Sequence, residues 1–228
     1  MSHHIEKPTD ITVPPTSLWA KLPLIGGAMA VVGLGATLGS AFGEDKARAM
    51  FSYLFAYEVV LSIALGALGF VLIQHLVRAG WSVTVRRVAE TAMATLPLFL
   101  LLWIPIWLLG RHDLYPWTHE TDEILERKRW FLSEGFFVGR AGFYLIGWSV
   151  LSMFLYRSSV KMDSLPDMAE RKRIIHTVWK VSAGGMFFYA LTQSFQAIDW
   201  LMSLTPHWYS TIFGLYYFAG SILAMYAF

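Results

Sequence analysis

Three ionisable side chains of this chain fall inside long apolar segments, where a charge is costly. They are Glu58, Arg140 and Asp199. Ionisable groups at membrane depth are rare; they pair with one another or mark proton relays and substrate sites. Two pairings of Arg140 stay open, one with Glu58 across helices and one with Glu134 less than two turns away. Glu58 is alternatively one half of a buried proton relay.

The segment around Asp199 carries a polar stripe. At about 100° per residue, its polar residues fall within an arc of roughly 120°. They are Tyr189, Thr192, Gln193, Gln196, Asp199, Trp200 and Ser203. Lipid cannot satisfy such groups, so we expect the stripe to face other helices or water. Three interpretations stay open: a hydrogen-bonded seam between helices, a proton path, and a site for a quinone head.

A turn with the sequence SLTPHWYS follows the stripe and adds a histidine and a tyrosine. A quinol site needs a polar group that accepts the hydroxyl proton, an apolar slot for the ring and an exit for protons. Asp199, His207 and Tyr209 are candidates for these parts. For His207 alone, capping of the loop after Pro206 is the other interpretation.

The residue types exclude several redox centres. The chain has no cysteine, so alone it holds neither an iron–sulfur cluster nor a covalent c-type haem. None of its seven histidines lies in the middle of an apolar segment, so we expect no transmembrane b-type haem. We therefore expect no cofactor bound covalently or by metal ligation. A role in electron transfer needs a diffusible carrier, such as menaquinone or ubiquinone, or a partner subunit that holds the centres.

Transmembrane helices must position these side chains. Of the 228 residues, 56% are hydrophobic and 15% are charged, whereas soluble domains are about a quarter charged. A spanning helix needs roughly 20 apolar residues, and a barrel needs short alternating strands. The sequence predicts an all-α polytopic transmembrane bundle with six helices, at about 22–42, 51–73, 89–110, 136–156, 181–202 and 210–228. No basic patch interleaved with exposed aromatics occurs, so nucleic-acid binding is excluded.

The lysines and arginines of the connections predict the orientation. More of them fall inside when the N-terminus is cytoplasmic, so residues 1–21 are predicted to form a cytoplasmic lead and residues 22–228 a transmembrane domain. The basic segment with Arg78, Arg86 and Arg87 then lies on the inner leaflet, where it suits anchoring to anionic lipid. The last apolar run stops at Phe228 without a polar tail, and we expect a fragment whose further helices are missing.

Two blocks are more specific than composition: SIALGALGFVLIQHLVRAGWSVTVRRVAE at residues 62–90 and FQAIDWLMSLTPHWYSTIFGLYYFAGS at residues 195–221. They resemble the F-type membrane subunit of alternative complex III, a bacterial quinol:cytochrome c oxidoreductase. This subunit is often labelled quinone-binding subunit 2 and is related to the NrfD/polysulfide-reductase membrane subunits. Weaker similarity extends from about Leu22 over nearly the whole chain. The resemblance implies two four-helix bundles with flanking helices, about ten in all, in the bacterial inner membrane.

The resemblance also implies partners and a role. Haem c and iron–sulfur centres would reside in other subunits of the complex, beside a C-type NrfD-like membrane subunit. The F-type subunit would support quinol binding or oxidation, or proton translocation, without redox centres of its own. The alternatives are a purely structural membrane scaffold and, outside the family, an independent secondary transporter. The polar positions of the matching blocks are His75 and Arg78 on the inner side, with Asp199, His207 and Ser210 on the outer side.

Overall fold

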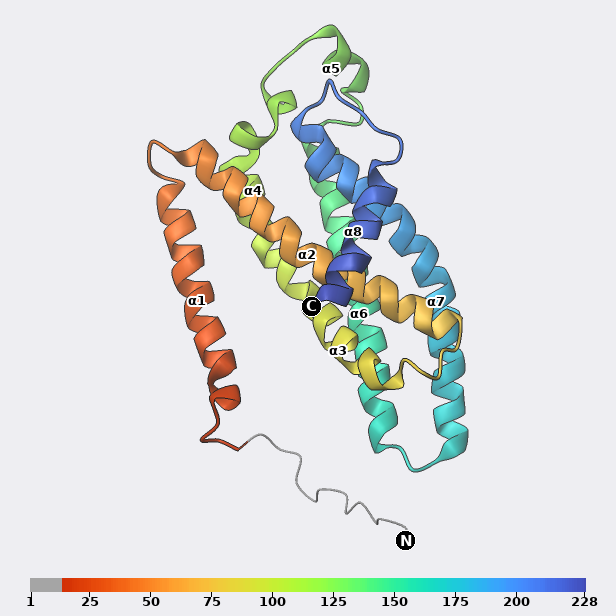
Figure 1. Ribbon diagram of the computed structural model, residues 1–228. Helices are drawn as coiled ribbons and strands as arrows, with labels where there is room; N and C mark the ends of the chain where they lie inside the picture. The colour runs from red at the N-terminus through yellow and green to blue at the C-terminus, as the bar shows by residue number, and fades with distance from the viewer. Residues whose placement is uncertain (1–13) are drawn as a thin grey trace. The chain divides into compact units, whose positions relative to one another are not determined.

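The computed structural model describes residues 14–228 (Figure 1). The chain divides after Lys46 into two units. The first unit contains α1 (Leu18–Ser40), which begins where the Ser17 hydroxyl accepts a hydrogen bond of 3.2 Å from the backbone N–H of Trp19. Apolar side chains cover α1 on all sides, a pattern typical of helices surrounded by lipid. Most of the predicted lead, residues 1–13 with His3 and His4, lies outside the described residues.

The second unit, Ala47–Phe228, is built from helices of very different lengths. The long ones are α2 (Lys46–Leu76), α4 (Leu96–Leu114), α6 (Glu134–Ser164), α7 (Met168–Gln196) and α8 (Phe213–Ala227). The short ones are α3 (Val83–Met93), η1 (Pro116–Thr118), α5 (Glu123–Lys128), η2 (Ala197–Leu201) and η3 (Met202–Leu204). No strand occurs between residues 14 and 228. The predicted all-α class is therefore confirmed.

Four helical segments of the described chain are long and apolar enough to cross a membrane: Leu18–Ser40, Lys46–Leu76, Val85–Leu114, which combines most of α3 with α4, and Glu134–Ser164. The protein is accordingly a helical membrane protein. Two of the six predicted spans do not reach this standard, because α7 combines a charged first half with the polar stripe in its second half and α8 has only 15 residues. The count of six, and the side on which the N-terminus lies, stay predictions.

Two predicted boundaries need correction. The fifth predicted helix begins at Met168 rather than near residue 181, since Asp167 caps it by accepting from the Ala169 N–H at 2.9 Å. The basic residues predicted for the preceding connection therefore all lie on α6 or α7: Arg157, Lys161, Arg171, Lys172, Arg173 and Lys180. The predicted helix 89–110 is broken at its start into α3 and α4. Pro97 lies in the first turn of α4, where its missing N–H leaves no helical bond unmade.

The connections of the second unit gather at two ends. Figure 1 shows the α4–α6 and α7–α8 connections together at the end that carries α5, and the α2–α3 and α6–α7 connections at the opposite end. We call these the α5 end and the α3 end. Within this unit, α6 packs against α4 and α7, and α7 packs against α8. The α5 end contains the loop that the sequence places on the outer side.

The core of the second unit lies around Trp200, which is fully buried. Its ring packs against Tyr57 of α2, Trp103 of α4 and Trp148 of α6, with ring centroids 5.9, 6.1 and 6.4 Å apart. Elsewhere α2 and α8 approach so closely that a Cβ at Gly66 would collide with the backbone carbonyl of Ser221. Small residues permit such approach where lipid supplies no hydrophobic drive.

Candidate functional site

The α5 end of α7 departs from regular helix. Ala197–Leu201 forms a π-helical turn, and a 3₁₀ turn follows at Met202–Leu204. Single π turns inside α-helices are rare and occur frequently at functional sites. Here the π turn presents Asp199 and Trp200 to the bundle interior, where both are fully buried.

Asp199 is held by a buried, bidentate ion pair. Arg140 of α6 donates from Nε to Oδ2 at 2.8 Å and from Nη2 to Oδ1 at 2.9 Å. Tyr144 donates its hydroxyl to Oδ2 at 2.9 Å. The remaining Nη1 of Arg140 donates to the backbone carbonyl of Phe131, whose ring lies 3.9 Å from the guanidinium carbon. Such charge-assisted, two-point bonds are the strong class of protein hydrogen bond.

Glu58 of α2 is the second buried acid, and its partners are neutral. Gln196 donates from Nε2 to the two carboxylate oxygens at 3.1 and 3.0 Å. Tyr217 of α8 donates its hydroxyl to Oε2 at 2.8 Å. Within residues 14–228 no lysine, arginine or histidine forms a salt bridge with Glu58. Glu58 therefore joins α2, α7 and α8 through a carboxylate that no cation balances.

The two acids are neighbours through the π turn. Gln196 precedes the turn and binds Glu58, while Asp199 lies within the turn. Two buried polar atoms of this turn region, Gln196 Oε1 and Trp200 Nε1, have no hydrogen-bond partner in the described part of the chain. One is an acceptor and the other a donor. The region thus offers buried hydrogen-bonding capacity beyond what the two acids use. We call Glu58, Gln196, Tyr217, Asp199, Arg140 and Tyr144 the buried polar network.

Both pairings predicted for Arg140 are wrong. Its partner is Asp199, and Glu134 instead pairs with Arg111 at 3.5 Å. The reason is helix packing, which brings Arg140 and Tyr144 of α6 against the inward-facing Asp199. The expectation for the stripe is confirmed, since all seven of its residues are buried inside the bundle: Tyr189, Thr192, Gln193, Gln196, Asp199, Trp200 and Ser203.

The stripe is also hydrogen-bonded along its length. Gln193 donates to the Ser221 hydroxyl at 3.2 Å, and Tyr189 donates to the Leu65 carbonyl at 2.9 Å. Ser203 donates to the backbone carbonyl of Asp199. These bonds link α7 to α2 and α8. A seam between helices is therefore part of what the stripe does.

The structure does not bring the other predicted site residues to the network. His207 lies in the exposed loop at the α5 end, with Nε2 3.0 Å from Asp122 Oδ2. Nearby, Lys128 donates to the Pro206 carbonyl at 2.6 Å, so this loop is fastened to α5. Ser210 accepts a backbone bond from Phe213 within the same loop. His75 lies in the last turn of α2, at the opposite end of the bundle.

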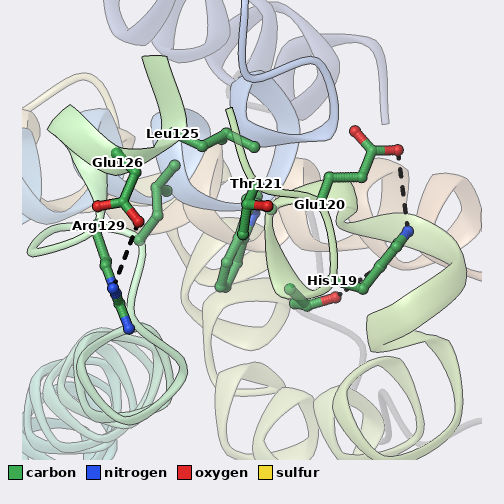
Figure 2. Close-up of a pocket in the computed structure, with 9 residues that line it drawn as sticks. His119, Glu120, Thr121, Leu125, Glu126 and Arg129 are labelled. Carbon is green, nitrogen blue, oxygen red and sulfur yellow. Dashed lines mark hydrogen bonds and ion pairs between the residues drawn. The ribbon is translucent and has the colours of Figure 1, made fainter. Parts of the chain in front are cut away.

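A small pocket also lies at the α5 end, between η1 and α5 (Figure 2). Its volume is about 250 Å³. The ionisable side chains that line it contact near neighbours in sequence, His119 with Glu120 at 4.0 Å and Arg129 with Glu126 at 3.5 Å (Figure 2). We do not assign the site to it, because its charges are exposed and locally matched.

Two members of the network were missed by sequence reasoning, although a signal existed for one. Tyr144 lies four residues after Arg140, so both project from the same face of α6. Tyr217 carries no comparable signal, since its partner Glu58 is 159 positions away. Within the described residues, no group of three histidine, aspartate or glutamate side chains could hold a metal ion.

A comparison with models of protein families finds no match, and neither does a comparison with curated proteins. The two sequence blocks at residues 62–90 and 195–221 are therefore the basis for assigning a family, and this assignment is a proposal.

Proposed function

We propose that this chain is an integral membrane subunit of a quinol:cytochrome c oxidoreductase of the alternative complex III type, and that Glu58 of its buried polar network exchanges protons during quinol oxidation. In this proposal it lies in the bacterial inner membrane with its N-terminus in the cytoplasm. Its partners are the haem c and iron–sulfur subunits and a C-type NrfD-like membrane subunit. The substrate of the complex is a quinol, derived from menaquinone or ubiquinone. The resemblance of residues 62–90 and 195–221 supports this assignment.

The observation that supports a proton role is that the hydrogen-bond partners of Glu58 are neutral. A group in a proton path must change its protonation state during turnover. If Asp199 took up a proton, the buried cation of Arg140 would lose its counter-charge, which is costly in a membrane interior. Glu58 faces no such penalty, because Gln196 and Tyr217 are neutral donors. We therefore place the proton-exchanging group at Glu58.

The arrangement of polar groups around Glu58 also indicates a direction for proton transfer. The Tyr217 hydroxyl donates to Glu58, and its oxygen can still accept a hydrogen bond from a second donor. Towards the α5 end, Gln196 joins Glu58 to the start of the π turn, where Gln196 Oε1 and Trp200 Nε1 have no hydrogen-bond partner in the described chain. This chain of polar groups runs towards the predicted outer side, where quinol oxidation would release protons.

A structural scaffold is the second candidate, and the Arg140–Asp199 pair favours it. This pair fastens α6 to the end of α7 with two bonds, and both carboxylate oxygens of Asp199 accept hydrogen bonds. In the scaffold account the network holds helices together so that partner subunits can dock.

Glu58→Gln in the purified complex separates the two candidates. The complex, reconstituted into liposomes, is supplied with quinol, and acceptor reduction and proton release are followed together. We expect the variant to assemble with its partners and to lose proton release, while Glu58→Asp, which keeps a carboxyl group, retains part of it. Glu134→Gln is the matched control, because this carboxylate is exposed at the start of α6. Unchanged turnover with unchanged proton release would contradict the proton role; loss of partner subunits alone would support the scaffold.

A further inference from the structure

A cavity of about 820 Å³ lies at the α3 end, between α2, α3, α6 and α7. Glu58 and Asp199 do not line it, so it is separate from the buried polar network. Gln74 and His75 close it from α2, and Trp179 borders it on α7. Nothing in the proposed proton role uses this cavity.

The lining of the cavity is strongly basic. Five cationic side chains line it, against two carboxylates: Arg78, Arg86, Arg87, Arg171 and Lys172, with Glu90 and Asp163. Both carboxylates are already engaged. Glu90 receives Arg86 at 3.1 Å and Arg87 at 3.4 Å, and Asp163 receives Arg87 at 2.5 Å.

Three of the cations have no carboxylate partner within the described chain: Arg78, Arg171 and Lys172. The Arg171 side chain donates from Nε to the Leu165 carbonyl at 2.7 Å. The guanidinium carbon of Arg78 lies 5.0 Å above the Trp179 ring. A cavity with an excess of positive charge and at least one guanidinium held on an aromatic face favours an anion, and a phosphate above all.

A buried amide adds a second requirement. Gln74 is only 6% exposed, lines the cavity, and its Oε1 has no hydrogen-bond partner within residues 14–228. The neighbouring His75 Nε2 is likewise buried without a partner. An amide oxygen accepts hydrogen bonds and does not suit a phosphate oxygen. The ligand that satisfies both kinds of group carries a phosphate and a hydroxyl.

The chain around the cavity is suited to the membrane surface. Val77, Trp81 and Val83 are exposed apolar residues of the α2–α3 segment, each at least 60% accessible. Arg78 lies among them with a φ of 51°, a backbone region that non-glycine residues occupy at a cost. The contact between the Arg78 guanidinium and the Trp179 ring offsets the cost of this backbone conformation. Apolar side chains at the rim of a basic cavity fit acyl chains, which a soluble phosphate lacks.

We infer that this cavity binds the headgroup of an anionic glycerophospholipid, with its phosphate at Arg78 and Lys172 and a headgroup hydroxyl at Gln74. Phosphatidylglycerol has this chemistry. Basic pockets between transmembrane helices bind such headgroups through the same combination of charge and interfacial position.

The test uses the full chain in nanodiscs of phosphatidylcholine, titrated with phosphatidylglycerol and followed by native mass spectrometry. We expect one phosphatidylglycerol to be retained per chain. Because each basic residue near the surface adds roughly a factor of five to anionic binding, the double variant Arg78→Gln, Lys172→Gln should weaken retention about thirtyfold. Arg173→Gln is the matched control, since Arg173 follows Lys172 in sequence and lines a different groove. It should bind like the wild type.

Two further arms identify the ligand. Soluble glycerol 3-phosphate should not compete at concentrations where the lipid is retained; equal competition would overturn the lipid assignment. Gln74→Met, which replaces the buried amide with an apolar chain of similar size, should keep binding but lose the preference for phosphatidylglycerol over phosphatidic acid. Retention of phosphatidylglycerol by the double variant at the wild-type level would overturn the site.

Discussion

Asp199 and Glu58 are buried in the same bundle, and each accepts one tyrosine hydroxyl, from Tyr144 and Tyr217 respectively. They differ in the remaining partner. Asp199 binds the guanidinium of Arg140, whereas Glu58 binds the carboxamide of Gln196. The difference is one of charge balance. In an apolar interior a paired charge is fixed by its partner, and an unpaired one is free to be neutralised by a proton.

Two regions at the end of α7 therefore have separate roles. The region of the π turn with Asp199 stabilises the contact between α6 and α7. The region one turn earlier, around Gln196 and Glu58, can change charge without breaking an ion pair.

Removing the guanidinium from the Asp199 region should cost the most. Arg140→Leu leaves a buried carboxylate without its cation, and breaking such a pair costs about 3–5 kcal/mol of unfolding free energy. The double variant Arg140→Leu, Asp199→Leu should recover a large part of this loss. Denaturation of the purified protein in detergent micelles measures both. As a control, Arg127→Leu breaks the exposed pair with Glu123 and should cost no more than about 1 kcal/mol. An equal loss from Arg140→Leu and Arg127→Leu would refute the structural role.

The two tyrosines should respond unequally. Tyr144→Phe removes a bond to a fixed charge and should cost about 1.5–3 kcal/mol. Tyr217→Phe removes a bond to an acid that is free to become neutral, and should cost about 0.5–1.5 kcal/mol. The same denaturation assay measures the two losses side by side. A larger loss from Tyr217→Phe than from Tyr144→Phe would reverse the comparison.

Gly66→Ala should disturb the Glu58 region alone. The added Cβ meets the backbone of Ser221, so α8 must move and carry Tyr217 away from Glu58. Overpacking of this kind costs about 1–3 kcal/mol. Gly142→Ala is the control, since nothing lies within 4 Å of a Cβ there. Hydrogen exchange should rise on α8 and stay unchanged on α6; exchange that rises on α6 as well would show that the two regions are coupled.

Glu58→Gln should have the smallest effect on stability. The new amide can donate to Gln196 Oε1, which has no partner in the described chain, and can still accept from Tyr217. We expect a change within about 1 kcal/mol, as for other substitutions that create no cavity and no unpaired charge. Asp199→Asn, measured in parallel, leaves Arg140 unbalanced and should cost more. The comparison fails if Glu58→Gln is the more damaging of the two.

Composition and periodicity were enough to predict the helical class and the inward direction of the stripe, because both follow from the cost of placing polar groups in lipid. They were not enough for the partner of Arg140. Glu58, Glu134 and Asp199 are all acids that could pair with Arg140, and the choice among them depends on how α6 packs against the end of α7. The hydrogen bond that Tyr217 of α8 donates to Glu58 of α2 depends on helix packing, which no local sequence pattern encodes.

The loop after Pro206 shows the same limit. In the sequence, a histidine and two hydroxyl groups closely follow the acid Asp199. This proximity predicts a single site that contains them all. The chain instead turns at Thr205 and lays His207 against Asp122, since the α4–α6 connection covers this end of the bundle. The polar residues nearest in sequence to Asp199 are therefore not its partners in space.

Infrared spectroscopy of the carboxyl groups tests the division between the two acids most directly. The protein in detergent or lipid is titrated with acid and base, and the band of protonated carboxylic acids is recorded for the wild type, Glu58→Gln and Asp199→Asn. We predict a titrating band from a buried carboxylic acid that is absent in Glu58→Gln and retained in Asp199→Asn. A band that survives in Glu58→Gln and disappears in Asp199→Asn would contradict the account.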